Sequence, residues 1–169
     1  MEDKVNLFLV GAMKAGTTSF IELLSQSEEI YIPPIKEPHY FVDKLPQSIY
    51  KPSRFFQLNY YFDNEFPKQI HIAKLNNLNQ YQKLYSLASS KHKYLVDAST
   101  CYLNSPETAH KIFQYNRDAK IIILLRDPLN RAISHYHMDV GLGRTLNSFE
   151  DEIKNDILDF RMNRLSTYS

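Results

Sequence analysis

Residues 11–18 combine the residue types that hold a phosphate-sized anion. The segment reads Gly-Ala-Met-Lys-Ala-Gly-Thr-Thr, and its two glycines allow a tight turn in which backbone N–H groups come close to a ligand. Lys14 adds a positive charge, and Thr17 and Thr18 add hydroxyl donors. We expect an anion-binding loop here, because a helix starting at Thr17 would also direct its free N–H groups and its dipole toward the ligand.

The position of the lysine separates this loop from that of nucleotide triphosphatases. Those enzymes carry the pattern G-x-x-x-x-G-K-[ST], in which the lysine directly precedes the hydroxyl residue that holds magnesium. Here Lys14 comes three residues after Gly11, and Thr17 follows Gly16 directly. A kinase or nucleotide triphosphatase is therefore the less favoured alternative, with Asp97 as its magnesium-holding carboxylate.

A second candidate anion site follows the most apolar segment of the chain. Residues 121–125 read Ile-Ile-Ile-Leu-Leu, and Arg126, Asp127 and Pro128 come next. The planar guanidinium of Arg126 suits a phosphate, and Ser134, eight residues later on the following helix, adds a hydroxyl. A surface Arg-Asp pair with a capping proline is the alternative interpretation.

Taken in this order, the two segments resemble the nucleotide-binding motifs of sulfotransferases that use 3′-phosphoadenosine 5′-phosphosulfate. The resemblance implies that Arg126 and Ser134 bind the 3′-phosphate of this donor. It also implies that the 5′-phosphosulfate is held by Gly11, Lys14, Ala15, Gly16, Thr17 and Thr18. Transfer of the sulfuryl group would leave 3′-phosphoadenosine 5′-phosphate as product and require no metal ion. A module of the same fold that binds a nucleotide without catalysis is the alternative.

Glu37 and His39 lie in the sequence Lys-Glu-Pro-His-Tyr-Phe, which resembles a segment of the carbohydrate branch of this family, the heparan-type sulfotransferases. The resemblance implies that Glu37 is the general base, that His39 assists at the acceptor, and that the acceptor is a carbohydrate hydroxyl. Lys14 would stabilise the negative charge on the leaving phosphate. We expect the neighbours Tyr40 and Phe41 to raise the pKa of Glu37 toward neutrality. A solvated loop carboxylate and a partly buried histidine remain open interpretations of the residues alone.

The segment Asp97-Ala98-Ser99 departs from the heparan-type pattern. Some members of that branch have an acceptor-contacting lysine at the place of Ala98, so this difference argues against a heavily sulfated glycan. Asp97 and Ser99 either line the acceptor cleft or cap the core. The remaining histidines show no metal-ligand spacing with carboxylates or cysteine, and we interpret them as surface or packing residues. They are His71, His92, His110, His135 and His137.

The elements that must position these residues alternate between strand and helix. Apolar runs predict strands at residues 5–10, 93–98 and 119–125, the last of them central and buried on both faces. Apolar spacing and capping signals predict helices from Thr17 or Thr18, over 76–90, over 105–116 with Ser105 as the cap, from Pro128 to about His137, and in the tail from Phe149. Prolines predict irregular segments between 30 and 68. The pattern predicts a P-loop-like α/β domain, a central parallel sheet flanked by helices, with ligands at the carboxyl ends of the strands.

Composition and charge limit the partners of the chain. Its 169 residues, 43% of them hydrophobic, suit one domain over residues 1–169, and a net charge of +1 argues against nucleic acid as a partner. No apolar run approaches the roughly 20 residues of a membrane span, and the single cysteine, Cys101, cannot form an intrachain disulfide. We therefore predict a cytoplasmic protein. The family's later basic, glycine-containing loop is not apparent, because residues 141–144 come too soon after Ser134, so we expect the C-terminal part of the domain to be missing.

Overall fold

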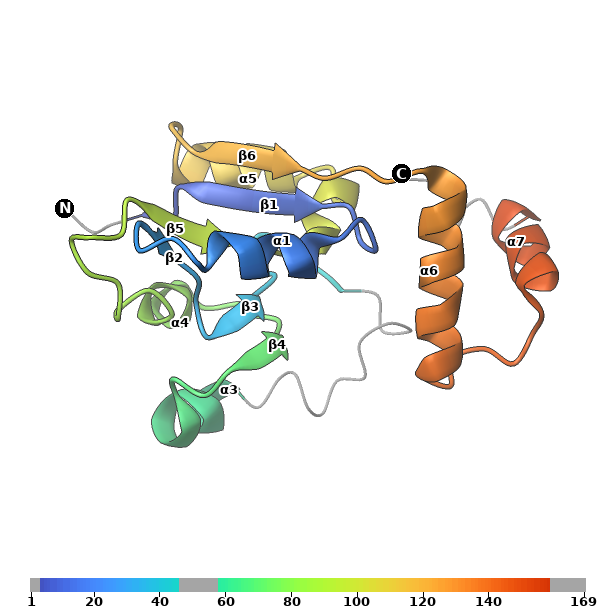
Figure 1. The fold of residues 1–169 in the computed structure, drawn as a ribbon. Coiled ribbons are helices and arrows are strands. Elements are labelled where there is room, and N and C mark those ends of the chain that lie inside the picture. The colour runs from blue at the N-terminus through green and yellow to red at the C-terminus, as the bar shows by residue number, and fades with distance from the viewer. Residues whose placement is uncertain (1–3, 46–57, 159–169) are drawn as a thin grey trace.

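The computed structural model describes residues 4–45 and 58–158 (Figure 1). Four parallel strands form the main sheet, and their order is β2-β5-β1-β6. The strands are β1 (Leu7–Gly11), β2 (Ile30–Tyr31), β5 (Tyr94–Asp97) and β6 (Lys120–Ile123). Helices flank this sheet, which confirms the predicted α/β class with a central parallel sheet.

β1 is buried along its whole length because both faces of the sheet are covered. Successive side chains of a strand point to opposite faces. Leu7 and Leu9 pack with Ile21 of α1 (Thr17–Leu24) on one face. Phe8 packs on the other face with Ile112 of α5 (Thr108–Tyr115), and Figure 1 shows these two helices on opposite sides of the strands. The predicted first strand is confirmed, and of the two helix starts considered, Thr17 and Thr18, the structure has Thr17.

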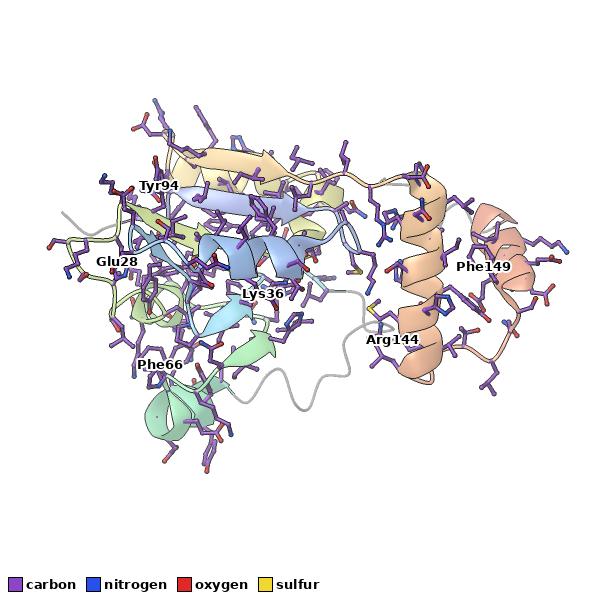
Figure 2. All side chains as sticks on the ribbon, viewed as in Figure 1. Glu28, Lys36, Phe66, Tyr94, Arg144 and Phe149 are labelled. Atoms are coloured by element: carbon purple, nitrogen blue, oxygen red, sulfur yellow. The ribbon has the colours of Figure 1, made fainter. Side chains whose placement is uncertain are left out.

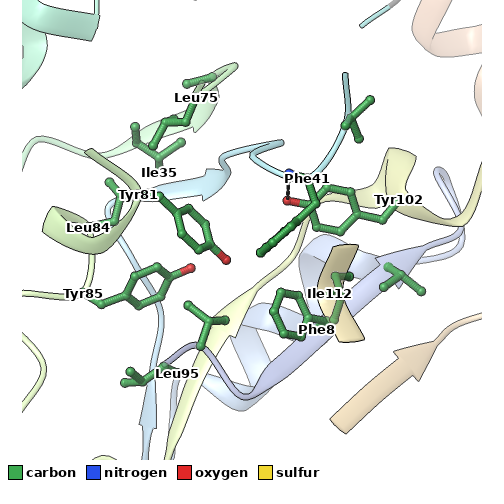
Figure 3. Close-up of a cluster of buried hydrophobic side chains, with 14 of the residues drawn as sticks. Phe8, Ile35, Phe41, Leu75, Tyr81, Leu84, Tyr85, Leu95, Tyr102 and Ile112 are labelled. Carbon is green, nitrogen blue, oxygen red and sulfur yellow. Dashed lines mark hydrogen bonds between the residues drawn. The ribbon is translucent and has the colours of Figure 1, made fainter. Parts of the chain in front are cut away.

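The larger of the two hydrophobic clusters contains several aromatic side chains (Figure 3), among which Phe41 contacts Phe8, Tyr81 and Tyr102 edge to face. Within this core, the hydroxyls of Tyr81 and Tyr102 each donate to Oδ2 of Asp97 at 2.9 Å. Burial raises the pKa of Asp97, while these donors oppose the rise. Asp97 is fully buried. Two roles were open for Asp97, lining the acceptor cleft or capping the core, and its position in the structure favours the core.

The strand predicted to be central lies at the edge of the described sheet. β6 pairs with β1 on one side only, and the side chains of Ile121 and Ile123 are 49% and 50% exposed. The prediction of burial on both faces was wrong for β6 because five branched apolar residues indicate a strand but not its neighbours. The two interior strands of the described sheet are β5 and β1.

Several helix boundaries differ from those predicted. α5 begins at Thr108 with Glu107 before it, so Ser105 does not cap the helix, although its carbonyl accepts a turn hydrogen bond from Thr108 N at 3.1 Å. The helix predicted over 76–90 is shorter, and its first turn is capped by the side chain of Asn77. The other helices are α3 (Leu58–Tyr60), η1 (Tyr61–Glu65), α4 (Leu78–Lys83), η2 (Thr100–Asn104), α6 (Pro128–Gly141) and α7 (Phe149–Leu158). Predictions for residues 46–57 and 159–169 lie outside the described residues.

A second, two-stranded parallel sheet lies beside the first one (Figure 1). It pairs β3 (Ile35–Glu37) with β4 (Ile70–Ile72), and Glu37 stands opposite Ile72 in the register. α6 stands beyond the ends toward which β1 and β6 point. No helix within residues 4–45 and 58–158 has the length and apolar character that crossing a membrane requires. One region of the molecule is thus surrounded by the carboxyl ends of the main-sheet strands, by the small sheet of β3 and β4, and by α6.

Candidate active site

The loop after β1 has the backbone geometry of an anion cradle. Gly16 precedes α1 in the left-handed region at φ 91°, and α1 begins at Thr17 without a side-chain cap. The first N–H groups of a helix have no partner inside it, so they are available to a ligand. Lys14 also has a positive φ of 66°, a conformation that is uncommon for a residue with a side chain and is often found at functional sites.

Pairing between β1 and β6 brings the second predicted anion site next to this loop. The pairing continues past the strand ends, since Ala12 N donates to Leu124 O and Leu124 N donates to Gly11 O, both at 2.8 Å. Two residues later, the guanidinium of Arg126 donates to the carbonyl oxygen of Lys14 at 3.3 Å. Main-chain hydrogen bonds therefore hold the two predicted phosphate segments side by side, as expected at the carboxyl ends of adjacent parallel strands.

Gly11 is required by a close approach to η2. Its φ of 150° lies in the region that side chains rarely adopt, and a Cβ at this position would lie 2.9 Å from the carbonyl oxygen of Thr100. Contacts this short between Cβ and backbone oxygen force a shift of the backbone. Gly11 thus acts by letting the loop sit against Thr100, which in turn contacts Glu37.

One cavity of about 520 Å³ joins the two anion segments to Glu37. Ligand pockets commonly span roughly 300–1,000 Å³. The predicted site residues that line the cavity are Lys14, Gly16, Thr17, Thr18, Glu37, Arg126 and Ser134. The predicted residues that do not line it are Gly11, Ala15 and His39. The other lining residues are Met13, Ile70, His71, Ile72, Thr100, Met138, Leu142 and Arg144.

The carboxylate of Glu37 is buried and held from several directions. Lys36 Nζ donates to its Oε1 at 2.9 Å and to the hydroxyl of Thr18 at 3.3 Å, which links Glu37 to the start of α1. Figure 2 labels Lys36 on β3 beside α1. The hydroxyl of Thr100 donates to Glu37 Oε2 at 2.9 Å. The arrangement fixes a negatively charged oxygen pair at the wall of the cavity.

The pKa of Glu37 shifts in the direction opposite to the one predicted. Burial alone would raise this pKa, but interaction with His39 and the positive charge of Lys36 lower it to about 2. The expected neighbours do not determine it, because Tyr40 stacks on Tyr81 and Phe41 packs in the core. The prediction of a pKa near neutrality was therefore wrong, and Glu37 is a carboxylate at neutral pH.

His39 lies behind Glu37 rather than in the cavity. Its side chain is fully buried, its Nε2 is 3.5 Å from Glu37 Oε2, and its Nδ1 is 3.2 Å from the carbonyl oxygen of Ala73. Its backbone N–H donates to the hydroxyl of Ser99 at 2.9 Å, and its φ is 49°. His39 is thus placed to act on Glu37 and not to touch an acceptor in the cavity.

Sequence reasoning missed three polar residues of the cavity: His71, Thr100 and Arg144. His71 lies on β4, where Ile70-His71-Ile72 gives no motif, and its place depends on the pairing of β4 with β3. Arg144 follows α6, at its foot in Figure 2, and its guanidinium contacts Asp139 at 3.1 Å. Residues 141–144 come soon after Ser134 in the chain, and Arg144 lines the same cavity as Ser134 and Met138 of α6.

Comparisons with known proteins agree on one family. The profile of the sulfotransferase family matches residues 6–168. The crystal structure of a sulfotransferase from Alicyclobacillus acidocaldarius aligns with 98% of this chain at a TM-score of 0.71 and 31% identity. A membrane-associated sulfotransferase of Dictyostelium discoideum, kil1, is 28% identical over 137 residues, which are 80% of this chain.

The chain spans only part of each of these relatives. It covers 61% of the chain in the Alicyclobacillus structure and 23% of the Dictyostelium protein. The similarity therefore covers most of this chain but only part of each relative.

Proposed function

The chain belongs to the sulfotransferase family, and from this we propose that it transfers a sulfuryl group from 3′-phosphoadenosine 5′-phosphosulfate to an acceptor hydroxyl, preferably on a carbohydrate. One observation carries the proposal. The same cavity is lined by the loop with Lys14, by Arg126 with Ser134, and by the carboxylate of Glu37. A donor with phosphates at its 3′ and 5′ positions needs two anion sites, and an acceptor hydroxyl needs a group that receives its proton.

The loop with Lys14 would stabilise the leaving group of the reaction. Lys14 and the N–H groups at the start of α1 would neutralise the charge that grows on the 5′-phosphate as its bond to sulfur breaks. Arg126 and Ser134 would hold the 3′-phosphate, and Arg126 is already braced against the loop through Lys14 O. The donor supplies an activated sulfur, and its release as 3′-phosphoadenosine 5′-phosphate completes the exchange.

Glu37 serves the acceptor side. Its carboxylate would accept a hydrogen bond from the acceptor hydroxyl and receive the proton as the new oxygen–sulfur bond forms. Lys36 and Thr100 hold the carboxylate in place, so it does not have to reorganise during the reaction. The low pKa of Glu37 keeps the carboxylate ionised before the attack, so it is able to accept a proton at neutral pH.

Ligand-dependent stability separates the proposed donor from the alternative. Unfolding midpoints should rise with 3′-phosphoadenosine 5′-phosphate in the absence of magnesium, because a ligand that binds only the folded state stabilises it. A rise that occurs only with adenosine triphosphate and magnesium would contradict the proposal and favour a kinase.

Transfer itself is tested with labelled donor against a panel of glycans, lipids and phenols. We expect label on a carbohydrate, and Glu37→Gln should reduce transfer by about 10²–10⁴-fold while donor binding persists. Glu28→Gln, at an exposed position after α1, is the matched control. Turnover of Glu37→Gln near that of the unaltered chain would refute the role of Glu37, and donor binding without transfer to any acceptor would indicate a non-catalytic module.

A further inference from the structure

Four side chains surround the carboxylate of Glu37, two at each oxygen. Thr100 donates to Oε2 at 2.9 Å, and His39 Nε2 lies 3.5 Å from the same oxygen. Lys36 donates to Oε1 at 2.9 Å, and His71 Nε2 lies 3.5 Å from it. If Glu37 receives a proton, these four side chains are the neighbouring protein groups to which the proton could be transferred.

Three of the four neighbours cannot carry that proton to solvent. Lys36 is an ammonium group with no acceptor capacity, and Thr100 has a hydroxyl that does not titrate. His39 is fully enclosed, with its Nδ1 facing the carbonyl oxygen of Ala73. None of them can both accept the proton and release it to water.

His71 differs from the other three in position. Its side chain is 58% exposed and lines the same cavity as Glu37 and the phosphate loop. It comes from β4, and the pairing of β4 with β3 sets its distance from Glu37. The imidazole thus touches the carboxylate on one side and open solvent on the other.

We propose, on the basis of the sulfuryl transfer proposed above, that His71 is the final acceptor of the proton removed from the substrate hydroxyl. The acceptor oxygen attacks sulfur, an oxygen–sulfur bond forms, and the bond from sulfur to the bridging oxygen breaks with its electron pair leaving on the 5′-phosphate. The hydroxyl proton passes to Glu37 and then to the unprotonated Nε2 of His71. His71 becomes an imidazolium, and its exposed ring returns the proton to water.

The charges around His71 suit this role. Burial lowers the pKa of His71, and the negative charge of Glu37 opposes that effect, while Lys36 and His39 add to it. The ring is therefore neutral at neutral pH and can accept a proton. Glu37, whose pKa is about 2, cannot keep a proton under the same conditions, so the proton moves from the carboxyl to the imidazole.

Transfer kinetics of His71→Ala test the proposal, with His110→Ala on the exposed face of α5 as the matched control. We expect kcat to fall by about 10²-fold with the KM for the donor unchanged, and added imidazole to restore much of the loss. For the unaltered chain, kcat should decline with falling pH in a range that lies below the ordinary histidine value of about 6.5, because the pKa of His71 is lowered, and His71→Ala should lack this decline. Stabilisation by 3′-phosphoadenosine 5′-phosphate reports that each variant is folded.

Two outcomes overturn the inference in different ways. If the unaltered chain and the control transfer sulfate and His71→Ala keeps their rate and pH profile, the role of His71 is refuted and the proposed function stands. If the unaltered chain transfers sulfate to no acceptor, the proposed function fails and the role of His71 fails with it. A nuclear magnetic resonance titration needs no acceptor: Glu37→Gln should lower the pKa of His71, and an unchanged pKa would show that the two groups are not coupled.

Discussion

Glu37→Gln should change how stability depends on pH, because ionisation of this carboxyl is coupled to folding. Its pKa is lowered from the ordinary 4.5 to about 2, and each pKa unit corresponds to about 1.36 kcal/mol. Ionised Glu37 therefore stabilises the folded state by about 3 kcal/mol relative to its protonated form. This contribution is present above the unfolded pKa of 4.5 and disappears as the pH falls through about 2.

The assay is urea unfolding of the unaltered chain and of Glu37→Gln at pH 5.5 and pH 3. The other carboxyl groups titrate in both chains, so their effect cancels in the difference between the two unfolding free energies. With folded and unfolded pKa values of about 2 and 4.5, the difference should shrink by about 2 kcal/mol between these pH values. Glu28→Gln, at an exposed position, should show no such change.

A difference in unfolding free energy that stays constant between pH 5.5 and pH 3 would refute the reasoning. It would mean that Lys36 and His39 do not stabilise the charge of Glu37 beyond the cost of its burial. The carboxyl would then have a pKa near its ordinary value, and the argument that it must pass its proton to His71 would lose its physical basis.

Three further substitutions test other parts of the structure. Arg126→Ala should weaken binding of 3′-phosphoadenosine 5′-phosphate roughly 10–100-fold in calorimetric titrations, since a charged hydrogen bond is worth about 1.5–3 kcal/mol; the exposed Arg117→Ala is the control, and equal affinities would contradict the assignment. Gly11→Ala should lower the free energy of unfolding by roughly 1–3 kcal/mol, because its Cβ would meet the carbonyl oxygen of Thr100 at 2.9 Å; an unchanged urea midpoint would show that the loop adapts. Asp97→Ala should lower the free energy of unfolding by about 1–3 kcal/mol or more, because it leaves buried hydroxyl donors without an acceptor; a loss under 1 kcal/mol would be evidence against this network.

The sequence predicted the strand, loop and helix start around residues 11–18 because the signals for these elements are local. A glycine, a lysine and two threonines between a strand and a helix start have the same meaning wherever the strand lies in the sheet. Arg126 after an apolar run is a local signal of the same kind. The structure brings both segments to one cavity, and the order of strand and helix was sufficient to predict the α/β class.

What the sequence could not predict depends on which elements become neighbours. The most apolar strand, β6, lies at the edge of the described sheet. This position could not be predicted, because the length and composition of a strand do not show which strands pair with it. The pKa of Glu37 is lowered, not raised, because interactions with His39 and Lys36 outweigh burial. Both residues are neighbours of Glu37 in the sequence, but only the fold shows that their side chains turn toward its carboxylate.

The sequence was enough to predict a strand, a glycine-containing loop and a helix start at residues 7–24, and a second segment around Arg126, because the residues of each lie next to one another in the chain. The other residues that line the cavity with these segments were found only in the folded structure. The pairing of β3 with β4 places His71 beside Glu37, and Arg144, which follows α6, lines the same cavity. Electrostatic interactions depend on distance in space. The interaction between Glu37 and His71 therefore could not be predicted from the sequence, in which the two residues lie far apart.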